Sequence, residues 1–393
     1  MLTQRQLFFN HLAQTSATPL ALEIEKAEGI YLTDVSGKRY MDLISGISVS
    51  NVGHRHPKVL KAIHDQLDKY LHLMVYGEYI QAPQVKLAKA ITDLLPENLN
   101  SVYFVNSGSE AIEGAMKLAK RFIGRTEIIS FKNAYHGSTQ GSLSIMGNEE
   151  FKNSFRPLLP DTRQIEFNNL THLKYITNRT AAVVVETIQG EAGAVIPKND
   201  FLKQLRERCN ETGTLLVADE IQTGFGRTGK LFAFEHYNFI PDIICIAKGM
   251  GGGMPIGAFI SSKEIMDSLS QNPILGHITT FGGHPVCCAA SEATLTVLLE
   301  EKLIEQVEQK EQLFRSLLKH PKIKSIHGKG LLLAIEFESY EQNKIIIDKC
   351  IAKGLITDWF LFNAQSMRIA PPLTITEEEI NIACKIILQC IIN

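Results

Sequence analysis

Asp219 and Lys248 are two charged residues that each end an apolar run of this sequence. The runs read TLLVAD at 214–219 and DIICIAK at 242–248. Apolar runs of this kind are typical of buried parallel strands, and open α/β sheets bind their ligands at the carboxyl ends of such strands. The two runs therefore predict an amine and a carboxylate at the same edge of a sheet.

An amine and a carboxylate so placed suit a cofactor that forms an imine with lysine and needs a protonated ring nitrogen. Pyridoxal 5′-phosphate is such a cofactor. Burial would lower the pKa of the Lys248 amine, as imine formation requires, and Asp219 would keep the ring protonated. A structural ion pair is the alternative explanation for either residue, because buried charges are usually paired.

The segment Asn106–Glu110, with the sequence NSGSE, lies between a predicted strand at 102–106 and a predicted helix at 110–122. Ser107 supplies a hydroxyl, Gly108 allows a close approach of backbone N–H groups, and the start of the helix carries partial positive charge. These properties predict an anion site. A serine-capped helix with a tight turn explains the segment equally well.

The elements that must position these residues alternate along the chain. Between about residue 100 and residue 250, apolar strands alternate with amphipathic helices, which predicts an α/β fold with a mostly parallel central sheet covered by helices. After about residue 286 the pattern predicts a smaller α+β domain. We expect the large cofactor-binding domain at 46–285 and the small domain at 1–45 together with 286–393.

Composition argues against several classes of function. The net charge of −2, from 40 Lys+Arg and 42 Asp+Glu, gives no basic surface for nucleic acid. No apolar stretch approaches the roughly 18 residues that span a bilayer. The seven cysteines include no C-x-x-C pair, which is typical of reduced thiols in a cytoplasmic protein. A phosphate-loop pattern at 224–230 lacks the Ser or Thr that would hold magnesium, because Leu231 stands there.

A series of ordered motifs gives these features a common explanation. The chain resembles the class III (ornithine/acetylornithine/4-aminobutyrate-type) pyridoxal-phosphate-dependent aminotransferases from about residue 20 to 380. This resemblance implies a fold-type-I transferase with a mostly parallel central sheet and a smaller α+β domain. The motifs are SGISV at 45–49, SGSEA at 107–111, YHG at 135–137, QGE at 189–191, DEIQTGFGRTG at 219–229, Lys248, TTFGG at 279–283 and RIAPP at 368–372.

The resemblance implies a role for each matching residue. Lys248 would form the imine and then move the proton between substrate and cofactor, and Asp219 would pair with the pyridinium nitrogen. In this family the active sites form at the interface of a homodimer, so Thr280 would reach the phosphate of the neighbouring subunit. The remaining implied cofactor contacts are Gln222 on the phenolic oxygen, Ile221 and Tyr135 on the two ring faces, and Ser107, Gly108 and Ser109 around the phosphate.

Glu191 and Arg368 match a pair of residues that controls substrate choice in the relatives. There the arginine binds the α-carboxylate of glutamate or 2-oxoglutarate. The glutamate neutralises the arginine when an ω-amino substrate occupies the site. An ion pair at the surface is the alternative explanation for two such residues.

Departures from the family pattern concern the substrate. Ser138 stands where the relatives usually carry an arginine that clamps a substrate carboxylate, and serine cannot form a bidentate charged clamp. Ile47 replaces a tyrosine of ornithine-type enzymes, which makes ornithine itself less favoured. Thr187 replaces a common proline.

The resemblance implies an aminotransferase that moves an amino group from an ω-amino acid or amine to 2-oxoglutarate by a ping-pong mechanism. An acetylornithine-like donor is the nearest match. The partners would be the small-molecule donor, the 2-oxo acid and a second copy of the chain, in the cytoplasm. An aminomutase or a racemase/epimerase of the same fold is the alternative enzyme class, and a non-catalytic homologue is a third hypothesis.

Overall fold

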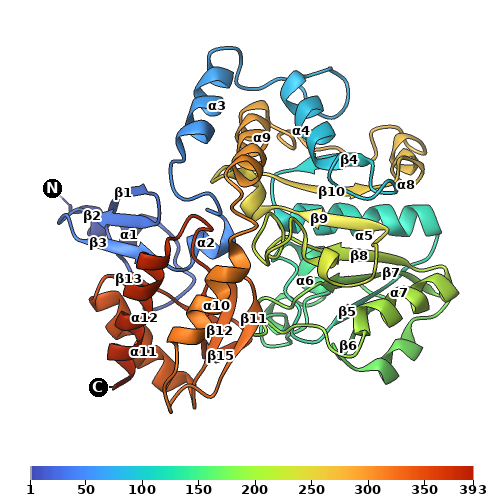
Figure 1. Cartoon of the computed structure of the whole chain (residues 1–393). Helices are drawn as coiled ribbons and strands as arrows, with labels where there is room; N and C mark the ends of the chain where they lie inside the picture. Colours follow the sequence, from blue (N-terminus) through green and yellow to red (C-terminus); the bar gives the residue numbers. More distant parts are fainter. Residues whose placement is uncertain (1, 393) are drawn as a thin grey trace.

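The central sheet of the computed structural model, which describes residues 2–392, has seven strands in the order β4-β10-β9-β8-β7-β5-β6 (Figure 1). Only β10 runs antiparallel to its neighbours, so the predicted mostly parallel sheet is confirmed. The strands are β4 (Ser101–Val105), β5 (Glu127–Phe131), β6 (Thr162–Ile165), β7 (Thr180–Glu186), β8 (Leu215–Asp219), β9 (Ile243–Ile246) and β10 (Gly257–Ser261).

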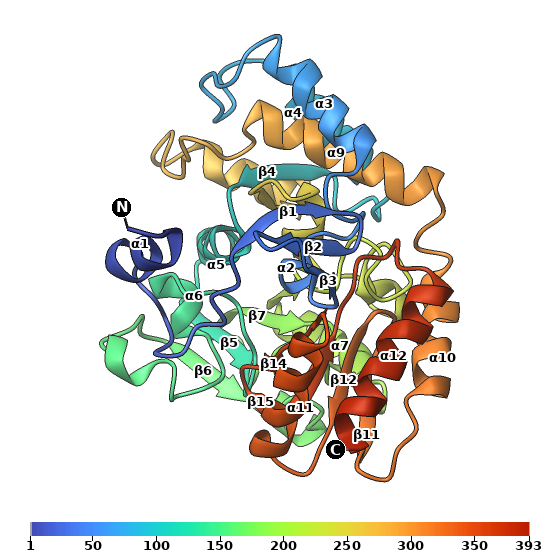
Figure 2. The ribbon, with the colours of Figure 1, turned by 90° about the vertical axis from the view of Figure 1, so that its left-hand side faces the viewer.

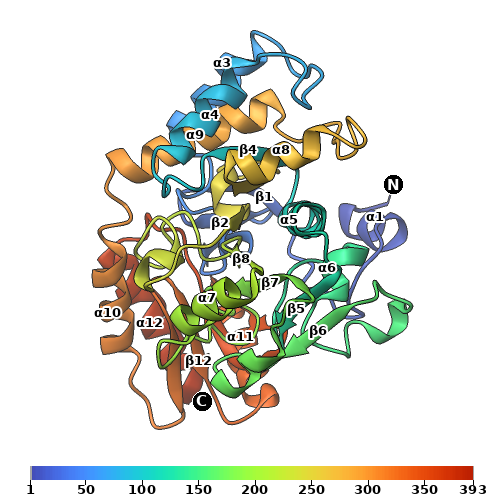
Figure 3. The same cartoon turned by 90° about the vertical axis from the view of Figure 1, so that its right-hand side faces the viewer.

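The apolar runs form inner strands because helices cover both faces of the sheet. Every residue of β7, β8 and β9 is buried. Alternate residues of β8 belong to two different cores: Val217 packs with α5 (Gly108–Ile123), whereas Leu216 packs with α7 (Phe201–Thr212). Figure 3 shows α5 and α7 on either side of the strands. A buried sheet with this register brings Glu186 and Asp219 side by side at its carboxyl edge.

An N-terminal segment and a C-terminal segment of the chain meet in a second sheet, of order β1-β2-β3-β13, and Figure 2 shows its first three strands side by side. Strand β13 (Leu355–Ile356) runs parallel to β3 (Arg39–Asp42), and the amide of Met41 donates a hydrogen bond of 2.8 Å to the carbonyl of Gly354. The first two strands are β1 (Ile24–Glu28) and β2 (Tyr31–Asp34). The predicted domain boundaries at 46 and 286 stay a prediction, and residues 1 and 393 lie outside the described residues.

A third sheet, of order β11-β12-β15-β14, completes the C-terminal part of the chain. The strands of this sheet are β11 (Ser325–Lys329), β12 (Leu332–Glu336), β14 (Trp359–Phe360) and β15 (Asn363–Ile369).

In the described residues, no helix has the length and apolarity needed to cross a membrane. The other helices are α1 (Gln4–His11), α2 (Ser45–Ser48), α3 (Pro57–Leu67), α4 (Ala82–Thr92), α6 (Gln140–Ser144), α8 (Lys263–Asp267), α9 (Pro285–Glu300), α10 (Val307–Leu317), α11 (Tyr340–Ala352) and α12 (Glu377–Ile392).

Candidate active site

A cavity of about 430 Å³ opens at the carboxyl edge of the central sheet. Loops after β4, β5, β7, β8 and β9 contribute to its wall, as expected for the ligand-binding edge of an α/β sheet. The predicted residues that line it are Ser107, Gly108, Ser109, Tyr135, Ser138, Asp219, Ile221, Gln222 and Lys248. Residues that line it without an earlier assigned role include Val49, Asn106, His136, Glu186 and Ile188.

Lys248 lies two residues beyond the end of its strand. The sequence predicted that the strand runs to Lys248, but β9 ends at Ile246 and Lys248 begins a short 3-10 turn, Lys248–Gly251. The φ of Lys248 is 48°, in the left-handed region that residues with a Cβ rarely adopt. The extended strand therefore ends just before Lys248, and the turn begins where Lys248 lines the cavity.

The amine of Lys248 is suited to act as a nucleophile and base. Among the described residues, no hydrogen bond or ion pair engages its Nζ atom. Burial lowers the pKa of Lys248 below its usual 10.5, although the negative charge of Glu191 opposes the effect. The positive charge of Arg368 acts in the same direction as burial. A larger share of neutral amine is therefore present near neutral pH than for an ordinary lysine.

Asp219 is held by His136, a residue for which the sequence predicted no role. The Nδ1 atom of His136 lies 2.7 Å from the Oδ2 atom of Asp219, and both side chains are buried. The amide of Ile221 donates a hydrogen bond of 3.0 Å to Oδ1 of the same carboxylate. The place of His136 beside Tyr135 in the YHG motif is the only sequence signal that could have indicated it. These two contacts fix the plane of the Asp219 carboxylate.

Glu186 is a second buried carboxyl at this edge, and it also had no assigned role. Its oxygens accept hydrogen bonds from the amides of Tyr135, at 3.1 Å, and Gly190, at 3.0 Å. Burial raises the pKa of Glu186 well above its usual range, and the neighbouring charge of Asp219 adds to the effect. Glu186 therefore ties the loops after β5 and β7 together at the wall of the cavity.

The start of α5 has the local geometry that was predicted for an anion site. Ser107 caps the helix, with its Oγ accepting a hydrogen bond of 3.2 Å from the amide of Glu110. The Oγ atoms of Ser109 and Thr139 lie 2.6 Å apart, so Thr139 joins this group. A Cβ added to Gly108 would come within 2.8 Å of the side chain of Ile221, so only glycine fits there. Free N–H groups in the first turn of a helix bind phosphate.

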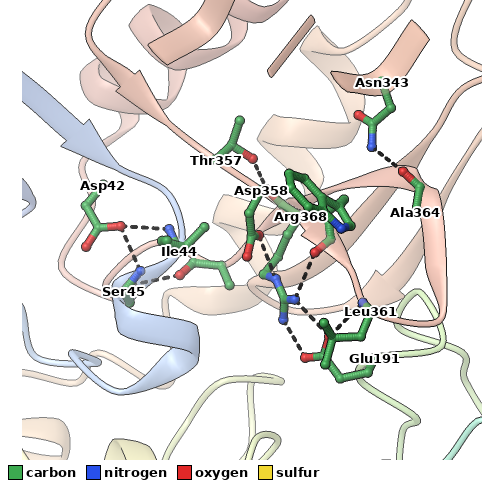
Figure 4. A network of polar contacts seen from close by, with 12 residues as sticks. Asp42, Ile44, Ser45, Glu191, Asn343, Thr357, Asp358, Leu361, Ala364 and Arg368 are labelled. Carbon is green, nitrogen blue, oxygen red and sulfur yellow. Dashed lines mark hydrogen bonds and ion pairs between the residues drawn. The ribbon is translucent and has the colours of Figure 1, made fainter. Parts of the chain in front are cut away.

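Glu191 and Arg368 form a buried ion pair beside the cavity (Figure 4). The two terminal nitrogens of Arg368 donate hydrogen bonds of 2.9 and 3.0 Å to the two oxygens of Glu191. Burial would raise the pKa of Glu191, but the charge of Arg368 and its hydrogen bonds outweigh burial and lower it. A further carboxylate, Asp358, accepts a hydrogen bond of 2.8 Å from Nε of Arg368. Asp358 lies outside the motifs that the sequence shares with the family.

Comparison with known proteins decides the family. The model of the family "Aminotransferase class-III" matches residues 12–391. The chain belongs to the class III aminotransferases. The curated acetylornithine aminotransferase of Methanopyrus kandleri is 38% identical over 373 residues, which are 94% of this chain and 94% of that protein.

Solved structures agree with this assignment. Ornithine aminotransferase from Toxoplasma gondii, described with partial occupancy of PLP at its active site, is 30% identical with a TM-score of 0.91, over 98% of this chain and 92% of that chain. A transaminase from the marine bacterium Virgibacillus is 28% identical with a TM-score of 0.92, over 99% of this chain and 98% of that chain. The predicted family, fold-type-I architecture, transaminase activity and pyridoxal phosphate cofactor are confirmed.

Pyridoxal phosphate fits the residues of this class III aminotransferase. The Nε2 atom of Gln222 is buried and has no hydrogen-bond partner among the described residues, so it can donate to a phenolic oxygen. A Cβ at Gly190 would lie 1.9 Å from Oε1 of Gln222, so glycine at position 190 makes room for that side chain. Ile221, Tyr135 and the start of α5 line the same cavity. Each implied cofactor contact therefore stays a prediction that this arrangement supports.

Four predicted residues do not line the cavity. Glu191 and Arg368 are buried beside it and act electrostatically on Lys248. Ile47 lies in α2, where its φ of 66° is left-handed, two residues before Val49 on the cavity wall. Thr280 is exposed, and its contact with a neighbouring subunit stays a prediction.

Proposed function

We propose that this class III aminotransferase moves an amino group from an ω-amino acid or amine to 2-oxoglutarate by a ping-pong mechanism. The observation that carries the proposal is the buried pair of Glu191 and Arg368 close to Lys248. Burying an arginine is costly unless a carboxylate neutralises it. Either Glu191 or a substrate carboxylate can therefore neutralise the guanidinium at this edge.

This exchange allows one cavity to accept both substrates in turn. The carboxylate of 2-oxoglutarate can take the two hydrogen bonds that Glu191 makes, because both groups match the fork of Arg368. A donor that presents an amine without an adjacent carboxylate leaves the pair of Glu191 and Arg368 closed. The two substrates therefore differ in whether they bind Arg368, but both place their reacting group next to Lys248.

The other residues of the site hold charge or move protons. When bound, pyridoxal phosphate supplies a carbonyl group that takes up the amino group and a ring that withdraws electrons from the adjacent carbon. The Nζ atom of Lys248, with its lowered pKa, can accept the proton from the substrate carbon and return it. The carboxylate of Asp219, oriented by His136, holds negative charge at the position of the ring nitrogen.

The donor is expected to be acetylornithine-like at its amine end. The relatives named for acetylornithine and ornithine support this class of donor. At the other end Ser138 offers only a hydroxyl, whose Oγ lies 3.2 Å from the Tyr135 hydroxyl. Lys248 is the only lysine or arginine among the described residues that line the cavity. Donors without a carboxylate near Ser138, such as simple ω-amines, should therefore react as well as ω-amino acids.

A half-reaction screen tests this function. Each donor, including acetylornithine, 4-aminobutyrate, ornithine and a series of amines, is mixed with the enzyme and the cofactor absorbance is followed. We expect a donor-driven loss of the carbonyl-form absorbance that 2-oxoglutarate reverses with formation of glutamate. Isomerisation of a substrate without any 2-oxo acid would instead favour an aminomutase or racemase/epimerase.

We further propose a homodimer with shared sites, in a reducing compartment such as the cytoplasm. Large apolar side chains are exposed on two adjacent segments, including Ile80 at 96% and Ile274 at 76%. The rings of His72 and Phe281, 4.9 Å apart, join these segments close to Thr280. An exposed apolar patch of this kind is typical of an interface. All seven cysteines are buried and free, which supports the compartment.

A further inference from the structure

Arg368 has two carboxylate partners, and they contact different edges of the guanidinium (Figure 4). Glu191 takes the edge formed by the two terminal nitrogens, whereas Asp358 accepts a hydrogen bond of 2.8 Å from Nε. Asp358 also accepts a main-chain hydrogen bond of 2.9 Å from the amide of Arg368 through its carbonyl. It therefore holds the arginine at both its backbone and its side chain.

Other contacts hold the side chain and the backbone of Arg368 without involving Glu191. One terminal nitrogen donates a hydrogen bond of 3.3 Å to the carbonyl of Trp359. The Cζ atom of Arg368 lies 4.4 Å from the centre of the Phe360 ring, close enough for a cation–π contact. The hydroxyl of Thr357 donates a hydrogen bond of 2.6 Å to the carbonyl of Arg368. Loss of Glu191 from the pair would leave all of these contacts in place.

Glu191 is held differently, by atoms that can stay in place when its side chain moves. Its backbone carbonyl accepts a hydrogen bond of 3.0 Å from the amide of Phe362. Apart from Arg368, the carboxylate has one described hydrogen-bond donor, the amide of Leu361 at 3.1 Å. The side chain of Glu191 can therefore leave Arg368 by breaking two side-chain hydrogen bonds and one to an amide. Asp358 is the fixed partner of the arginine and Glu191 is the exchangeable one.

We propose that Asp358 is the positioning residue that holds Arg368 in place while Glu191 is exchanged for the carboxylate of the amino acceptor. This inference rests on the proposed exchange between Glu191 and a substrate carboxylate. Through Nε, Asp358 directs the free edge of the guanidinium to the place that Glu191 vacates. Both hydrogen bonds between Asp358 and Arg368 can remain in place during the exchange.

The geometry of Asp358 matters more than its charge. Glu191 and the substrate carboxylate carry the same charge, so a fixed negative charge at Asp358 affects both states alike and nearly cancels in the exchange. A hydrogen bond to Nε, by contrast, sets the plane in which both terminal nitrogens must lie. Burial also raises the pKa of Asp358, and the positive charge of Arg368 opposes this rise.

Two variants of Asp358 separate these roles. Asp358→Ala removes the acceptor for Nε, and it should raise the KM for 2-oxoglutarate at least about ten-fold, as expected for the loss of a charge-assisted hydrogen bond. Asp358→Asn keeps an oxygen that can accept from Nε, and it should stay within about three-fold of wild type. The rate of the half-reaction with a simple ω-amine, which does not use Arg368, should change less than about two-fold in both variants.

A matched control and the wild-type enzyme complete the experiment. Asp348→Ala removes an exposed aspartate of α11 that pairs with Lys344, and it should leave both half-reactions unchanged. If Asp358→Ala slows the donor and acceptor half-reactions by the same factor, or changes neither, Asp358 has no positioning role. If Asn is as damaging as Ala, the charge rather than the hydrogen bond is responsible and the proposal is wrong. If wild-type enzyme shows no response to 2-oxoglutarate, the proposed function fails and this inference with it.

Discussion

The imidazole of His136 and the carboxylate of Asp219 lie 2.7 Å apart although their strands, β5 and β8, are separated by β7 in the sheet. The contact is possible because the loop after β5 passes over the carboxyl end of β7. Glu186 holds that loop through the amide of Tyr135, the residue before His136. The orientation of the Asp219 carboxylate thus depends on a side chain that no strand pairing supplies.

Replacing His136 with alanine should slow the donor half-reaction by roughly ten-fold or more. The variant leaves a buried carboxylate with one amide partner, and the loss of a hydrogen bond to a charged group costs about 1.5–3 kcal/mol. Stopped-flow absorbance of the donor half-reaction measures the effect. The matched control is His236→Ala. His236 is part-buried outside the cavity, and its Nε2 atom lies 3.0 Å from the carbonyl oxygen of Thr228. Equal rates in wild type and His136→Ala would show that Asp219 needs no support from His136.

Asp219 could be assigned from the sequence because the run that ends on it allows few structural interpretations. A continuous apolar segment in an alternating chain becomes an inner parallel strand, and its last residue then lies at the carboxyl edge. The same reasoning located the start of α5 and, apart from the left-handed turn, Lys248. These features depend on local sequence and on burial alone.

The supporting contacts could not be predicted, since they depend on how separate elements meet. His136 and Asp219 are 83 residues apart and are joined across an intervening strand. Asp358 and Arg368 are only 10 residues apart, but their contact requires the short strand β14 and the irregular register of its pairing with β15. A strand of two residues is too short to show a periodic pattern of apolar residues. Its register therefore cannot be predicted from the sequence.

Ser138→Arg should shift the donor preference toward donors with a carboxylate far from the reacting amine. Ser138 is exposed at the cavity, so a longer side chain has room. A guanidinium can form the bidentate clamp that serine cannot, and we expect a gain of roughly ten-fold in kcat/KM for such donors relative to simple amines. Ser138→Met, of similar length but uncharged, is the control. The same donor profile in all three enzymes would mean that position 138 does not select the donor.

Thr187→Val should destabilise the protein, and more at pH 8 than at pH 5. Thr187 donates a hydrogen bond of 2.6 Å to the buried carboxyl of Glu220. Burial raises the pKa of Glu220 from 4.5 to about 7, and the hydrogen bond from Thr187 opposes this rise. Without Thr187 the pKa in the folded state rises further. Glu220 then stays protonated in the folded state, but not in the unfolded state, over a wider range of pH. The free energy of unfolding therefore falls further as the pH rises.

Urea unfolding at the two pH values measures this difference. At pH 8 we expect a loss of about 1–3 kcal/mol, because an ionised buried carboxyl has lost a donor. At pH 5 Glu220 is largely protonated in both enzymes and the loss should be smaller. Thr296→Val, at an exposed position of α9, should have little effect at either pH. A loss that is equal at pH 5 and pH 8 would contradict a titrating Glu220.

Thr280 and Lys248 of different subunits should complement each other. If Thr280 serves the neighbouring site, a heterodimer of Lys248→Ala with Thr280→Glu keeps one site in which both residues are intact, because a symmetric dimer pairs each site with the other subunit. Such a heterodimer, purified with two different tags, should retain about half of the wild-type activity. Either homodimer alone should be nearly inactive, since one lacks the nucleophile and the other places a carboxylate at the phosphate.

The reverse arrangement provides the control for shared sites. In a heterodimer of wild type with the double variant Lys248→Ala/Thr280→Glu, one site lacks the lysine and the other receives the altered residue 280. Shared sites therefore predict almost no activity here. If Thr280 instead serves its own subunit, the wild-type subunit keeps a complete site. The heterodimer that contains wild type is then active, and the heterodimer of the two single variants is inactive. Because both heterodimers contain the same substitutions, a difference between them cannot come from misfolding and must come from which subunit supplies Thr280.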